Sequence, residues 1–175
     1  MINNWIRYAF PKYIDKTVNS EDCFRVLKAK EQIKLSPVQK EDIILLCRQY
    51  FKEIGIDIPI IEINLNDVPI KRGFYSDLME KYNLAEKKDI LWLKFTTDEY
   101  LGVVAASNDI NFSYENTSGK IISYLNKNWD DKYVIIIPLI SGLGGTLNRQ
   151  RFESGLGNYL ISHNVPILDY FSHNL

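Results

Sequence analysis

The chain has little of the side-chain chemistry that small metal proteins use. Its 175 residues include only two cysteines, Cys23 and Cys47, and only two histidines, His163 and His173. These four residues are spread along the sequence and form no zinc-binding pattern. Cys47 follows the apolar run Ile43–Leu46, where a thiol is typical of a buried core position.

Long apolar runs are absent as well. No segment approaches the roughly 20 apolar residues that a membrane-spanning helix requires. The opening residues 1–8 lack the basic and then apolar order of a signal peptide. We therefore expect a cytoplasmic protein that does not enter a membrane.

A strong charge of one sign is also missing. The formal net charge is −1 and the isoelectric point is about 6.1. Proteins that grip nucleic acid directly usually carry a clearly basic surface. The composition therefore predicts no direct contact with nucleic acid.

Catalytic motifs are missing too. The sequence contains no G-x-S-x-G, no H-E-x-x-H and no set of kinase motifs. We interpret both histidines as structural or surface residues, because a general base needs a nucleophile and an orienting carboxylate nearby. Glu62, Asp89 and Lys94 could be arranged like a metal-dependent nuclease centre, but their spacing is not distinctive. We predict a protein that is not an enzyme and that holds no cofactor or metal.

The last third of the chain carries the clearest structural pattern. An apolar strand is expected over residues 133–139, followed by a glycine-rich loop, a helix over 148–164 and a strand over 165–171. This order is typical of a βαβ unit. It predicts an α/β protein with a single domain over residues 1–175, and with a mixed or mostly parallel central sheet on which helices pack.

The middle of the chain predicts one long helix and two strands. Ser36 is expected to cap a helix that begins at Pro37 and ends at Gly55. Strands are expected over 58–65 and 90–95, and a helix start over 97–100. Residues 101–106 fit either a strand or a helix.

Gly142–Gly145 lies between a strand and a helix, where a Rossmann fold places its phosphate loop. Asp169, in the next predicted strand, could bind a ribose. The glycine pattern departs from that motif, because Leu147 occupies the third glycine position. The alternative is a plain connection whose glycines need a positive φ.

Arg149 and Arg151 crowd the start of the last helix. Cations at a helix N-terminus oppose the helix dipole, so they require compensation. An internal carboxylate is one answer, and a bound phosphate or an acidic partner is the other. Gly155 and Gly157, inside the same helix, indicate close packing of that helix on the sheet.

Acidic residues dominate residues 96–131. This segment has six acids against Lys120 and Lys127, a net charge of −4. The acids are Asp98, Glu99, Asp109, Glu115, Asp130 and Asp131. A surface of one sign can steer a partner of the other sign; the alternative is a set of ordinary solvated loop residues, with Asp98 and Glu99 serving a helix start.

The chain as a whole resembles the immunity proteins of bacterial contact-dependent growth inhibition systems. The likeness lies in its size, its lack of catalytic motifs and its abundance of isoleucine, lysine and asparagine. It also lies in the opening Met1-Ile-Asn-Asn-Trp-Ile-Arg-Tyr8, and in the closing segments Gly155-Leu-Gly-Asn-Tyr159 and Val165-Pro-Ile-Leu-Asp-Tyr-Phe-Ser-His173.

The resemblance implies a cytoplasmic protein with no reaction of its own. Such a protein binds the C-terminal toxin domain of a surface protein, often a nuclease acting on tRNA or DNA, and blocks its active site. An acidic inhibitor suits the basic groove of such a nuclease. The six acids would then make charge contacts, and Tyr114 and Trp129 would be aromatic anchors; the alternative is that these aromatic residues belong to the core.

Two other classes stay open at this point. One is a small nucleotide- or phosphate-binding enzyme that uses Gly142–Gly145, Arg149, Arg151 and Asp169. The other is a structural subunit of a larger assembly.

Overall fold

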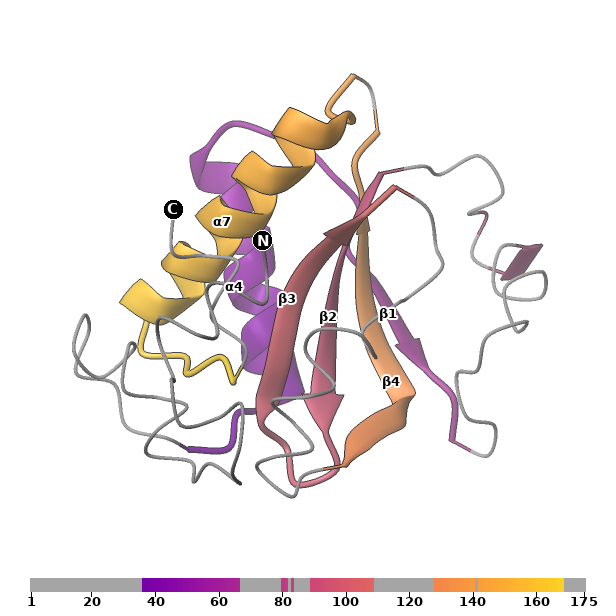
Figure 1. The fold of residues 1–175 in the computed structure, drawn as a ribbon, viewed down its shortest axis with the longest axis vertical. Coiled ribbons are helices and arrows are strands. Elements are labelled where there is room, and N and C mark those ends of the chain that lie inside the picture. The colour runs from indigo at the N-terminus through magenta and orange to yellow at the C-terminus, as the bar shows by residue number, and fades with distance from the viewer. Residues whose placement is uncertain are drawn as a thin grey trace, which may run out of the picture.

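A computed structural model describes residues 36–66, 80–81, 83, 89–108, 128–140 and 142–168. Its described part is a four-stranded sheet with two helices on one face (Figure 1). In chain order the elements are α4 (Lys40–Glu53), β1 (Ile61–Asn64), β2 (Ile90–Thr96), β3 (Leu101–Ser107), β4 (Trp129–Pro138) and α7 (Thr146–Ser162).

The sheet is antiparallel throughout. Its strand order is β1-β4-β2-β3, and every neighbouring pair is antiparallel. The predicted mixed or mostly parallel sheet is therefore wrong. The connection between β2 and β3 is only residues 97–100, which is far too short for the crossover that parallel strands need. The expected helix start in these four residues is instead a hairpin turn, called here the β2–β3 turn.

The misleading signal was the continuous apolar run in the strands. β2 is buried at every position, and β4 is buried from Tyr133 to Pro138. Such runs are typical of parallel sheets because both faces of those sheets are covered. An antiparallel sheet that is buried on both faces produces the same pattern.

The chain after α7 returns to the β3 edge of the sheet, which is the edge opposite β1. Ile167 forms a single parallel bridge with Leu101 of β3, and the amide of Leu168 donates to the carbonyl of Leu101 at 3.0 Å. A strand over 165–171 was predicted; residues 169–171 lie outside the described part. Since β2 and β3 lie between β4 and this bridge, the predicted βαβ unit is not a pair of adjacent parallel strands.

The start of α4 also differs from the prediction. The helix begins at Lys40 with Gln39 as its N-cap residue, not at Pro37 with Ser36 as the cap. The amide of Val38 donates to the carbonyl of Glu99 at 2.8 Å. This contact with the β2–β3 turn holds the chain extended before the helix. The helix ends as predicted, because Gly55 follows it with a φ of 75°.

Alternating side chains of the sheet feed two cores. The helix-side core contains Leu91, Leu93 and Phe95 of β2 against Cys47 of α4 and Leu160 of α7. The predicted burial of Cys47 is confirmed, since it is 0% exposed and burial raises the pKa of its thiol to about 12. The second core lies on the other face of the sheet and consists of Ile63, Ile90, Trp92, Val103, Val134 and Ile136.

α7 packs on α4 as well as on the sheet. A Cβ at Gly155 would overlap the hydroxyl of Tyr50, so α7 lies close to α4 at this position. Phe51 and Phe152 extend the contact, with ring centroids 5.9 Å apart. The expectation that Gly155 marks packing on the sheet is therefore wrong, because its close neighbour belongs to a helix.

This close approach predicts that Gly155→Ala destabilises the protein by up to about 2 kcal/mol. Overpacking a filled site costs about 1–3 kcal/mol, and the higher helix propensity of alanine over glycine returns ~1 kcal/mol of that cost. Urea denaturation measures the difference. The matched control is Tyr50→Phe, which removes the overlapping oxygen. Gly155→Ala in that background should be neutral or stabilising, and a similar loss in both backgrounds would refute the contact.

Candidate functional site

Five of the eight residues predicted to bind a partner meet at one end of the sheet. Asp98 and Glu99 lie in the β2–β3 turn, and Trp129, Asp130 and Asp131 begin β4. The amide of Thr97 donates to the carbonyl of Asn128 at 2.8 Å, which ties the turn to the start of β4. We call the four carboxylates here, Asp98, Glu99, Asp130 and Asp131, the acidic end. The other three predicted residues, Asp109, Tyr114 and Glu115, lie outside the described part of the chain.

The β2–β3 turn is held by the side chain of Thr96. Its hydroxyl donates to Asp98 Oδ1 at 2.7 Å and accepts from the amide of Tyr100 at 3.1 Å. Glu99 has a φ of 67°, an uncommon conformation for a residue other than glycine. Asp98 and Glu99 are both exposed. They serve a hairpin turn, so the predicted role at a helix start is wrong.

The start of β4 bulges away from β2. Lys94 pairs with Val134, whereas Thr96 pairs with Trp129. Two steps along β2 (94 to 96) therefore correspond to five along β4 (129 to 134). Extra residues of this kind bend a strand and redirect its side chains. Asp130 and Asp131 lie in this bulge.

Three groups hold Asp130. Lys40 Nζ of α4 lies 2.7 Å from its Oδ2, and the amide of Lys132 donates to its Oδ1 at 3.0 Å. Lys94 Nζ donates to its backbone carbonyl at 2.9 Å and lies 3.7 Å from Asp131 Oδ1. The Asp131 side chain stays half exposed. Asp130 is thus an anchor of the bulge. Asp98, Glu99 and Asp131 lie at exposed positions, although Asp98 also accepts from Thr96 and Asp131 also pairs with Lys94.

Lys94 is the residue whose role sequence reasoning missed. Its side chain is 0% exposed, and its alternation along β2 places it on the face of the second core. Burial lowers the pKa of its ammonium, and Asp131 and then Asp130 oppose that shift. A lysine inside the apolar run Ile90–Phe95 was the available signal, because a charge at such a position needs partners.

For Trp129 the sequence left two possibilities open, an aromatic anchor for a partner or a core residue. It is half-buried, and it contacts both cores. A Cβ at Gly102 of β3 would overlap its ring, so the indole lies directly over the β3 backbone. Trp129 therefore contributes packing between the strands at the acidic end.

The glycine loop is filled by the chain's own carboxylate. Asp89 Oδ2 accepts from the amide of Gly145 at 2.8 Å, and its Oδ1 forms an ion pair with Arg149. A Cβ at Gly144 would overlap the same carboxylate. Asp89 thus stands at the N-terminus of α7, where a phosphate was the alternative. The prediction of an internal carboxylate beside Arg149 is confirmed.

Two glycines of this loop have the positive φ that a plain strand-to-helix connection was expected to need. Gly142 and Gly145 have φ values of 82° and 97°, which glycine adopts without strain. Arg151 is exposed. Asp169, the expected ribose ligand, lies outside the described residues.

The residues considered for a nuclease centre do not gather. Glu62 pairs with Ile135 and so faces the helix side, whereas Lys94 pairs with Val134 and faces the second core. Asp89 lies at the other end of β2, beside α7. Within the described ranges no cluster of three or more histidine, cysteine or acidic side chains could hold a metal ion.

Comparisons with known proteins add no relative. No family model, no curated protein and no solved structure matches the chain. Neither described helix has the length and apolar character needed to cross a bilayer.

Because burial lowers the pKa of Lys94, the unfolded chain binds its proton more tightly than the folded chain does. Below the pKa that Lys94 has in the folded chain, both states are protonated and folding carries the full cost of burying the charge. This cost disappears as the pH rises toward the pKa that Lys94 has in the unfolded chain. We therefore expect wild-type stability to rise relative to Lys94→Met across the alkaline range below the pKa of an exposed lysine. Urea denaturation at stepped pH measures this difference, and parallel curves would refute it.

The Asp89 contacts predict a graded loss of stability. Asp89→Ala should cost about 2–3 kcal/mol, because Arg149 and the Gly145 amide lose their partner and the backbone keeps a strained φ. Asp89→Asn is the matched control, since asparagine retains an acceptor and tolerates the left-handed conformation that Asp89 adopts at a φ of 57°. It should cost less than Asp89→Ala in denaturant titrations. Equal losses in the two variants would contradict this prediction, because the ion pair with Arg149 would then contribute more than the hydrogen bond from the Gly145 amide.

Proposed function

We propose that this chain is an immunity protein, which binds the toxin domain of a contact-dependent growth inhibition system and occludes its active site. The observation that supports the proposal is the gathering of exposed carboxylates at the acidic end. Under this proposal the chain acts in the cytoplasm, performs no reaction, and has a nuclease toxin domain as its partner.

The electrostatic character of the acidic end suits a basic partner. Tyr133 lies in β4 just beyond the bulge, and its pKa is raised first by burial and then by the carboxylates of Glu62, Glu41 and Asp130. Several acids therefore act on one point at this end. A toxin groove that binds nucleic acid is positively charged, so the acidic end would steer it and speed association.

The frame under the carboxylates is ordered before any partner arrives. Thr96 holds the turn that carries Asp98 and Glu99, while Lys40 and Lys94 hold the bulge that carries Asp131. A surface that is already ordered loses less conformational entropy on binding. This is the property expected of an inhibitor that must act faster than its toxin.

The decisive experiment pairs the purified chain with the C-terminal domain of the surface protein expected in the adjacent reading frame. The variant Asp98→Lys with Glu99→Lys should weaken binding about tenfold or more, mainly through slower association. Its melting temperature should fall by only about 2–5 °C, because both side chains are at the surface and the change removes the hydrogen bond from Thr96 to Asp98. Stopped-flow association and calorimetry provide the two measurements.

The control is Glu53→Lys with Asp57→Lys, which changes the net charge equally. Glu53 ends α4 (Lys40–Glu53), roughly 20 Å from its start at a rise of 1.5 Å per residue, and Asp57 lies in the segment that follows the helix. The control should bind like the wild type. Unchanged affinity in the first variant would remove the acidic end from the interface, and a metabolic operon beside the gene would contradict the class.

A further inference from the structure

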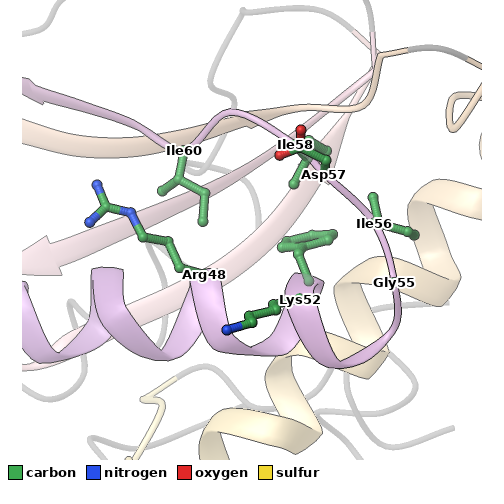
Figure 2. Close-up of a pocket in the computed structure, with 8 residues that line it drawn as sticks. Arg48, Lys52, Gly55, Ile56, Asp57, Ile58 and Ile60 are labelled. Atoms are coloured by element: carbon green, nitrogen blue, oxygen red, sulfur yellow. The ribbon is translucent and has the colours of Figure 1, made fainter.

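A groove at the C-terminal end of α4 is lined by cationic and apolar side chains, and none of them belongs to the acidic end. It has a volume of about 520 Å³ and lies between the last two turns of α4 and the extended segment that leads into β1. Figure 2 shows Arg48 reaching from α4 toward Ile60, with Ile56 and Ile58 along the facing segment. Phe51, which is 2% exposed, forms the apolar floor.

Two cations line the helical wall of this groove without internal partners. Within the described part of the chain, neither the guanidinium of Arg48 nor the ammonium of Lys52 forms a hydrogen bond or an ion pair. Like charges four residues apart in a helix repel each other. The helix dipole favours Lys52 in the last turn of α4, but Arg48 lies one turn earlier. No contact of the Arg48 side chain within the described residues therefore explains a stabilising role for this cation.

The opposite wall is apolar. Residues 56–60 alternate between half-buried isoleucines and exposed positions, as an extended segment does when only one of its sides is covered. Ile56, Ile58 and Ile60 take the side that lines the groove. Asp57 also borders the groove, and its side chain is exposed to solvent.

The shape favours an extended chain over an enclosed small molecule. Of the residues that line the groove, only Phe51 is buried, so the groove is open to solvent along its length. Small-molecule sites usually enclose about 70–90% of their ligand. A groove with a helix on one side and an extended segment on the other fits a peptide strand.

The spacing of the two cations determines which peptide fits. Lys52 lies four positions after Arg48 in the helix, which is about 6 Å along the axis. Alternate side chains of an extended peptide lie about 6.6–6.8 Å apart on one side. Two acids separated by one residue can therefore face both cations, while the residue between them points toward the isoleucine wall.

We propose that this groove binds an extended peptide segment of a protein partner with the pattern acid–apolar–acid. Its two carboxylates pair with Arg48 and Lys52, and its central apolar side chain packs on Ile56, Ile58 and Phe51. The site lies at the opposite end of α4 from the acidic end. It is independent of toxin inhibition, so either proposal can fail without the other.

The test is a nuclear magnetic resonance titration of the full ¹⁵N-labelled chain with the peptide acetyl-Gly-Asp-Leu-Asp-Gly-amide. The amides of Phe51, Gly55 and Ile56 should shift and saturate. Arg48→Gln with Lys52→Gln should weaken binding at least tenfold. The control Arg151→Gln, which removes an exposed cation from α7, should leave binding unchanged. Melting curves establish that each variant folds.

Two further titrations complete the design. The same peptide with asparagine in place of both aspartates should not bind. Sodium decanoate tests a small amphipathic acid as the occupant. The proposal is overturned if the aspartate peptide produces no saturable shift at these amides, if the double variant binds it equally well, or if decanoate alone moves them.

Discussion

The antiparallel pairing of β2 with both β3 and β4 is the constraint on which the rest of the described structure depends. It brings the end of β2, the start of β3 and the start of β4 to the same edge of the sheet. Acids that are about thirty positions apart in the chain, Asp98 and Asp131, thereby share one end. In a parallel sheet the starts and ends of these strands would lie at opposite edges.

In the same region, each lysine that is fully or partly buried against the sheet has a carboxylate or carbonyl partner. Lys94 reaches Asp130 from the second core, and Lys40 reaches it from the helix side. Each ammonium removed from water is matched to a carbonyl or a carboxylate, as the cost of burying a bare charge requires. At the opposite end of β2, Asp89 and Arg149 repeat this pairing and fill the N-terminus of α7. Arg48 and Lys52 lack such partners in the described residues, and this contrast distinguishes the groove from the paired sites.

Local patterns identified where the regular elements lie better than how they are arranged. The whole segment predicted as a strand over 90–95 lies in β2, and Gly55 follows the end of the helix after Ser36 as expected. The start of that helix was wrong because a tertiary hydrogen bond from Val38 to Glu99 competes with the local cap. The β2–β3 turn was taken as a helix start, although two acids beside Thr96 also suit a turn stabilised by a threonine hydroxyl. Nothing in the local pattern separates these two outcomes.

By itself, the sequence determined that Cys47 and the apolar runs of β2 and β4 are buried, where the chain bends at glycine, and that acids are concentrated in residues 96–131. These properties follow from side-chain solubility and backbone sterics, which act over a few residues. Only the tertiary structure decided the direction of the strands, the role of Lys94 as an internal anchor, and the choice of Asp89 rather than a more local acid as the partner of Arg149. Each of these depends on contacts between residues far apart in the chain, and the free energy of such contacts is set by which segments meet in space.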